Sequence, residues 1–158
     1  GGMEQLDETH IRVAAGVTMT RAALFAAGLG LSGLEFAHGI PGTVGGGIYM
    51  NAGAYGGEIC QVCTQVDVMD RKGNFRTLTA EQMEFSYRHS ILEETGDIVI
   101  SAVFKLTPQP VAQIRARMKE LMEKRFPVNI SEYYKTETLL KKDIERESKG
   151  IKEIPIHI

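Results

Sequence analysis

The residues with the clearest chemical meaning lie in one run of glycines. Residues 39–57, GIPGTVGGGIYMNAGAYGG, hold eight of the chain's 17 glycines and carry no charged side chain. Glycine loses more conformational freedom on folding than any other residue, so such a cluster needs a physical reason. Apolar residues such as Val44, Ile48 and Met50 distinguish the segment from a flexible linker. We therefore expect a packed loop whose main-chain amides face a ligand.

The two cysteines, Cys60 and Cys63, form a C-x-x-C pair. A zinc site needs two further ligands at suitable spacing, and the four histidines are scattered along the chain. A redox dithiol needs a thioredoxin-like context, which the flanking residues lack. We expect reduced, partly buried thiols in a strand and no metal site.

Length and composition restrict the class of protein. The 158 residues suffice for about one domain, and 43% of them are hydrophobic, which allows a substantial core. The net charge of −2 argues against binding to nucleic acid, because proteins that bind nucleic acid carry an excess of basic residues. Since no apolar run approaches about 20 residues and the first residues do not resemble a signal peptide, we expect a cytoplasmic protein without a membrane partner.

The segments around the glycines predict the elements that position them. Alternating apolar residues predict a strand at 10–17, and Thr18 is a suitable N-cap for a helix at 19–27 that Gly28 would end. A short helix at about 44–50 would present free N–H groups to an anion. A strand at 59–70 should pair with 75–78 across a turn.

The second half of the chain continues with isolated helices and strands. Thr79 should cap a short helix at 80–85, a strong strand follows at 97–106, and Pro110 should start an amphipathic helix at 111–125. These elements lack a regular βαβ rhythm, and the spacing of Gly42, Gly45 and Gly46 does not match a dinucleotide fingerprint. The pattern favours an α+β fold with a mainly antiparallel mixed sheet flanked by helices.

Three motifs together carry a family resemblance. The run GLEFAHGIPGTVGGGIYMNAGAYGGEI, the later SYRHS and the strand IVISAVFKL closely resemble the UDP-N-acetylenolpyruvoylglucosamine reductases, the MurB family. These are flavoproteins of peptidoglycan precursor synthesis, and the resemblance covers roughly residues 13–125. It implies FAD as cofactor, NADPH as co-substrate and a nucleotide-sugar substrate. The implied fold is the second subdomain of a vanillyl-alcohol-oxidase or PCMH-type FAD-binding domain.

The resemblance also implies roles for individual residues. Arg88 would be catalytic, near the flavin and the enolpyruvyl carboxylate, and Tyr87 would bind substrate. A guanidinium binds a carboxylate through two parallel hydrogen bonds and stabilises developing enolic charge. From the residues alone, a surface arginine at Arg88 and a core aromatic at Tyr87 are the favoured interpretation, and the resemblance reverses that preference. The implied cofactor-binding residues are Gly39, Ile40, Pro41, Gly42, Thr43, Val44, Gly45, Gly46, Asn51, Gly53, Ala54 and Ile59.

Parts of the family pattern have no match in this sequence. The family places a G-x-G-S-N-type flavin loop ahead of these motifs and a G-S-x-F-K-N-P-type motif, whose serine is the general acid, after them. Ser131 and Ser148 lack the flanking residues of that motif, and 152–158 do not match the context of the family's C-terminal glutamate. We therefore expect an incomplete FAD-binding subdomain at 1–127 and a charge-rich, divergent tail at 128–158.

Two functions remain open at this point. The chain is either part of a fuller NADPH-dependent reductase of UDP-N-acetylglucosamine enolpyruvate, or a truncated, catalytically inactive module that binds FAD or associates with itself. A homo-oligomer would cover faces that further domains otherwise cover. A phosphate-binding loop in an unrelated fold accounts for the glycines but not for Tyr87 and Arg88. Whether this chain alone is an enzyme stays undecided.

Overall fold

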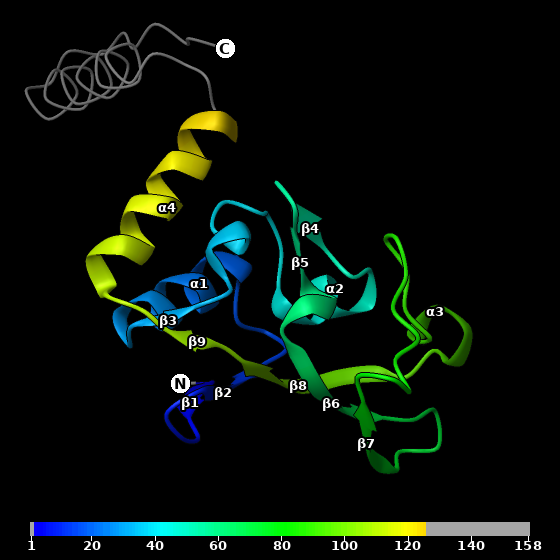
Figure 1. Ribbon diagram of the computed structural model, residues 1–158. Helices are drawn as coiled ribbons and strands as arrows, with labels where there is room; N and C mark the ends of the chain where they lie inside the picture. The colour runs from blue at the N-terminus through cyan, green and yellow to red at the C-terminus, as the bar shows by residue number, and fades with distance from the viewer. Residues whose placement is uncertain (1, 126–158) are drawn as a thin grey trace, which may run out of the picture. The chain divides into compact units, whose positions relative to one another are not determined.

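A five-stranded sheet forms the framework of the computed structural model, which describes residues 2–125 (Figure 1). Its strand order is β1-β2-β8-β6-β7, and every neighbouring pair is antiparallel. The α+β class with a mainly antiparallel sheet is therefore confirmed. The strands are β1 (Met3–Gln5), β2 (His10–Ala14), β6 (Cys63–Met69), β7 (Phe75–Thr79) and β8 (Ile98–Lys105).

Helices and short strand pairs complete the fold. Two residues each of β3 and β9 pair with one another, as do β4 and β5. The helices are α1 (Met19–Gly28), α2 (Val44–Tyr49), α3 (Leu92–Thr95) and α4 (Val111–Arg125), with 3-10 turns η1 (Glu35–Ala37) and η2 (Ile59–Gln61). The short strands are β3 (Leu31–Ser32), β4 (Gly53–Ala54), β5 (Gly57–Glu58) and β9 (Thr107–Pro108).

The hydrophobic core lies between the sheet and the two helices α1 and α2 (Figure 1). The sheet contributes Val66 and Phe104, α1 contributes a stripe of alanines, and α2 contributes Val44 and Ile48, all of them buried. Small alanine side chains let α1 approach closely, and burial of the larger side chains stabilises the packing. The core thereby fixes α2, which carries three of the eight glycines of the segment.

The start of the chain follows its local signals closely. The Thr18 hydroxyl accepts a hydrogen bond from the Arg21 amide at 3.1 Å, so the predicted cap of α1 is confirmed. The strand predicted at 10–17 is shorter and ends at Ala14, because the Ala14 carbonyl accepts from the Val17 amide in a turn.

Two later predictions were wrong in detail. The strand expected from residue 59 begins at Cys63, because Glu58 and Gln61 form a capping box that turns 59–61 into η2. The helix expected at 80–85 is a series of turns, since Glu84 takes a left-handed φ of 46° that stops helical propagation.

Contacts group residues 1–122 into one unit and residues 123–158 into another. The tail predicted at 128–158 lies outside the described residues. Among those that are described, no helix combines the length and apolarity that crossing a bilayer requires.

Candidate functional site

The amides at the start of α2 have partners within the protein. The Val44 amide donates to the Val17 carbonyl at 2.8 Å, and the Gly45 amide donates to the Ala15 carbonyl at 3.0 Å. The Gly46 amide donates to the hydroxyl of Thr43, the N-cap. The expectation that this helix start presents free N–H groups to an anion was therefore wrong, because main chain and cap already satisfy them.

Some of these glycines are required by packing. A Cβ atom on Gly45 would lie 3.1 Å from the Cβ of Ala15, and one on Gly47 would lie 2.7 Å from the Met19 sulfur. The first distance is tighter than nine in ten real Cβ contacts and the second is closer than real Cβ atoms come, so a side chain at either position would require Ala15 or Met19 to shift. These two glycines belong to the core side of the segment.

Other glycines face outward and leave main chain exposed. Gly42 has a φ of +112° and is exposed, and a Cβ there would meet nothing within 4 Å. Gly46 is also exposed, and its Cβ would meet only the Thr43 hydroxyl, at 3.7 Å. Within the described part of the chain, the amides of Gly42 and Thr43 donate no hydrogen bond. Bare main chain with two available amides fits a flat ring bearing polar edges, as a flavin does.

The exposed residues continue along α2 as one stripe. Gly46, Tyr49 and Met50 have the i, i+3, i+4 spacing of a shared helix face, and both side chains are 43% exposed. At 1.5 Å per residue the helix spans about 9 Å. A surface of that length therefore joins the exposed Gly42 at one end of α2 to the residues that follow its other end.

A tight turn carries Tyr87 and Arg88 at its tip. Ser86 and His89 exchange backbone hydrogen bonds of 3.1 and 3.2 Å, which closes the turn with two residues between them. Arg88 takes a left-handed φ of 50°, a strained conformation for a side chain of this kind. The Ser90 hydroxyl donates to the Tyr49 carbonyl at 2.5 Å, which ties the turn to the end of α2.

The guanidinium of Arg88 is held in a fixed direction. It donates to the carbonyls of Gly53 at 2.9 Å and Asn51 at 3.3 Å, and it lies 5.0 Å from the centre of the Tyr87 ring. In the described residues it pairs with no carboxylate. A guanidinium has five N–H donors, so three are available for an anionic ligand.

The remaining residues predicted to bind cofactor or substrate differ in their exposure. Gly39 and Ile40 are partly exposed, and their amides donate to Thr20 and Ala37, whereas Pro41 is exposed. Val44 and Ile59 are buried in the core as whole residues. Gly53 and Ala54 form β4, Asn51 is buried, and Tyr87 is 82% exposed.

Sequence reasoning did not single out Tyr49 or Ser90, although both join the turn to α2. Ser90 is wholly buried, and its hydroxyl also accepts from the Leu92 amide at 3.3 Å. The position of Ser90 two residues after Arg88 is only a weak sequence signal for this contact. Its hydrogen-bond partner, the Tyr49 carbonyl, lies 41 residues earlier in the chain.

The two thiols are protonated at neutral pH. Burial raises the pKa of Cys63 to about 12. Burial also raises the pKa of Cys60, whose thiol donates to the Glu58 carboxylate at 3.3 Å. Both cysteines are free rather than disulfide-bonded, and neither is a reactive thiolate.

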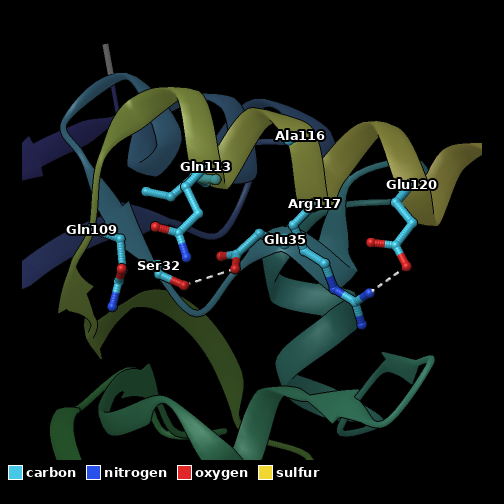
Figure 2. A pocket seen from close by; sticks show the side chains of 8 residues that line it. Ser32, Glu35, Gln109, Gln113, Ala116, Arg117 and Glu120 are labelled. Atoms are coloured by element: carbon cyan, nitrogen blue, oxygen red, sulfur yellow. Dashed lines mark hydrogen bonds and ion pairs between the residues drawn. The ribbon is translucent and has the colours of Figure 1, made fainter.

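A separate cavity of about 430 Å³ lies beside α4 and is lined mainly by polar side chains (Figure 2). The Glu35 carboxylate there accepts from the Ser32 hydroxyl at 2.7 Å and from the Gly33 amide at 2.6 Å. Arg117 pairs with Glu120 at 3.0 Å (Figure 2). Each of these charged groups has a partner within the protein, and no residue of the glycine segment lines this cavity.

Comparison with known proteins bears on the cofactor. A family profile described as "FAD binding domain" matches residues 2–79. A crystal structure of UDP-N-acetylenolpyruvylglucosamine reductase (MurB) from Thermus caldophilus superposes with a TM-score of 0.68 and 37% identity. The match covers 77% of this chain and 44% of that one. Fold and profile together define an FAD-binding domain.

Comparison with curated relatives points to one kind of FAD-binding enzyme. The UDP-N-acetylenolpyruvoylglucosamine reductase of Lactobacillus acidophilus is 48% identical over 117 residues, which cover 74% of this chain and 39% of the relative. The enzyme of the same name from Agathobacter rectalis is 49% identical over 128 residues, covering 80% and 41%. These matches confirm the resemblance of the chain to the UDP-N-acetylenolpyruvoylglucosamine reductases (MurB), and the chain spans about two fifths of the length of these relatives.

Proposed function

We propose that this chain forms the flavin-contacting middle part of a UDP-N-acetylenolpyruvoylglucosamine reductase. As part of a fuller enzyme it would use NADPH to reduce UDP-N-acetylglucosamine enolpyruvate to UDP-N-acetylmuramate. The observation that carries the proposal is the exposed surface along α2, with bare main chain at one end and Arg88 at the other. FAD, when bound, supplies the hydride-transfer chemistry.

The glycine end of this surface holds the cofactor. The Gly42 and Thr43 amides donate to polar atoms of the ligand, and the bare backbone at Gly46 allows a ring to approach within van der Waals distance. Tyr49 and Met50 provide the apolar contact that a ring system needs beside such amides.

The turn end of the surface binds the substrate. The guanidinium of Arg88 is oriented by two carbonyls before any ligand arrives, so little entropy is lost when it binds the enolpyruvyl carboxylate. The same positive charge stabilises the negative charge that develops on that group as the double bond is reduced. Tyr87, exposed beside the arginine, contacts the substrate.

Binding measurements test this assignment. FAD titration, followed by flavin fluorescence, should give saturable binding to the wild-type chain and to the Arg88→Ala variant. Affinity for the enolpyruvyl nucleotide, measured by calorimetry with FAD present, should fall by about ten- to a hundredfold in Arg88→Ala, because charge-assisted hydrogen bonds are lost. The control Arg21→Ala removes an exposed arginine from α1. Equal nucleotide affinity in wild type and Arg88→Ala would contradict the proposal.

An activity measurement then separates the whole reaction from its flavin-binding part. The purified chain is supplied with FAD, NADPH and the enolpyruvyl nucleotide, and oxidation of NADPH is followed by absorbance. Turnover assigns the complete reaction to this chain. FAD binding without turnover assigns it the flavin-contacting part of a fuller enzyme.

The second candidate function is a self-associating module. Met69 is the cross-strand partner of both Phe75 and Ile98, so the three side chains share one face of the sheet. Phe75 is 77% exposed and Ile98 is 57% exposed. Such a row favours contact with a second copy of the chain. Sedimentation should show a dimer that Ile98→Lys disrupts, whereas a monomer at all concentrations would argue against this function.

A further inference from the structure

Asn51 is buried and forms hydrogen bonds to several separate segments of the protein. It is 1% exposed, and it takes a left-handed φ of 46°. Its side-chain oxygen accepts from the Cys60 amide at 2.9 Å, and its side-chain nitrogen donates to the Ser86 carbonyl at 2.9 Å and, at 3.4 Å, to Glu58. Its own carbonyl accepts from Arg88. One buried residue thus joins the end of α2, the start of η2 and the turn.

The bond to Ser86 acts on the atom that closes the turn. The Ser86 carbonyl accepts both from the Asn51 side chain and from the His89 amide, and the two residues between Ser86 and His89 include Arg88. The Asn51 side chain therefore fixes the base of the turn while its carbonyl fixes the guanidinium. We propose that Asn51 is the positioning residue for Arg88, acting on the turn and not on the cofactor. This inference rests on the proposed role of Arg88 in substrate binding.

Few residue types satisfy this position. Asparagine tolerates a left-handed backbone better than most side chains, and its amide offers both an acceptor and a donor. Aspartate keeps the backbone tolerance and the acceptor for Cys60 but has no donor for Ser86. Glycine keeps only the backbone tolerance. Asn51→Asp therefore removes the bonds donated to Ser86 and Glu58 while it keeps the acceptor for Cys60.

Hydrogen exchange tests the proposal without any bound ligand. Asn51→Asp should make exchange of the His89 amide about three- to tenfold faster, because the turn loses one buried hydrogen bond. Exchange of amides in β6 and β8 should change much less. The matched control is Gln61→Glu, which makes the same amide-to-carboxylate change and removes a bond to the Gly56 carbonyl. His89 exchange unchanged in Asn51→Asp would overturn the proposal. Asn51→Gly serves if the aspartate variant does not fold.

A double-mutant cycle tests whether Asn51 acts through Arg88. In the wild-type background Asn51→Asp should weaken enolpyruvyl-nucleotide binding by about tenfold. In the Arg88→Ala background it should have no effect on that binding, since nothing remains to be positioned. Additive losses would overturn the proposal.

FAD affinity distinguishes a role of Asn51 in the turn from a role as a cofactor ligand. Asn51→Asp should leave FAD affinity within about twofold of wild type, because its contacts lie within the protein. A loss of FAD affinity with unchanged His89 exchange would make Asn51 a cofactor ligand instead. If Arg88→Ala binds the nucleotide as wild type does, the proposed function fails, while the exchange result still decides whether Asn51 holds the turn.

Discussion

Gly46→Ala should stabilise the fold and weaken flavin binding at the same time. Gly46 lies inside α2 with no left-handed φ, and an added Cβ would meet only the Thr43 hydroxyl at an ordinary 3.7 Å. Alanine is favoured over glycine in a helix by about 0.5–1 kcal/mol. The thermal unfolding midpoint should therefore rise by roughly 1–4 °C.

The same methyl group should obstruct a ring that lies against the helix. Forcing a methyl group into a close contact costs roughly 1–3 kcal/mol, so FAD affinity should fall by about five- to a hundredfold. Calorimetric or fluorescence titration measures that affinity, and circular dichroism gives the unfolding midpoint.

Gly28→Ala is the matched control for this substitution. Gly28 is the exposed last residue of α1, and a Cβ there would meet nothing within 4 Å. It should also raise the unfolding midpoint, and it should leave FAD affinity unchanged. Wild-type FAD affinity in Gly46→Ala would contradict the claim that FAD lies against the bare main chain at this residue. A lower unfolding midpoint would contradict the claim that a Cβ at Gly46 fits in α2 without a clash.

Three further predictions concern stability and thiol chemistry. A hydrogen bond from the Thr9 amide is the main cause that lowers the pKa of Asp7 from 3.8 to about 2. The stability Asp7 contributes is therefore complete above about pH 4 and is lost as the pH falls towards 2, so urea melts of Asp7→Ala and wild type should converge there; a constant difference would contradict this. Because burial holds the pKa of Cys63 at about 12, this thiol should react with a colorimetric thiol reagent only after unfolding, and rapid native-state labelling would be the opposite result. Gly57→Ala would place a Cβ 2.8 Å from Phe36 and should lower the free energy of unfolding by roughly 1–3 kcal/mol, measured in urea; an unchanged midpoint would show that Phe36 moves freely.

Sequence reasoning succeeded where the signal is local. The cap at Thr18, the strand β8 and the start of α4 after Pro110 depend on neighbouring residues, and each has the expected place. It failed at 80–85 although the Thr79 hydroxyl does accept from the Gln82 amide. There the Ile91 amide donates to the Met83 carbonyl at 2.8 Å, a tertiary bond that replaces helix continuation and that no local pattern reveals.

The site shows the same limit at the level of single residues. The motifs identified the glycine segment and the arginine, but not which glycines serve packing and which leave main chain exposed. Gly47 and Gly42 are alike in the sequence, but in the fold Gly47 packs against Met19 whereas Gly42 is exposed with a φ of +112°. The tie between Asn51 and Ser86 spans 35 residues, so it requires the folded arrangement of α2 and the turn.

The most direct test of the account is a map of backbone amide resonances of the isotope-labelled chain during titration with FAD. We expect shifts concentrated at Gly42, Thr43 and Gly46, with smaller changes near Arg88 at the other end of α2. Shifts confined to the residues beside α4, with the amides of 42–46 unchanged, would contradict the claim that the exposed glycine backbone is the flavin-binding surface.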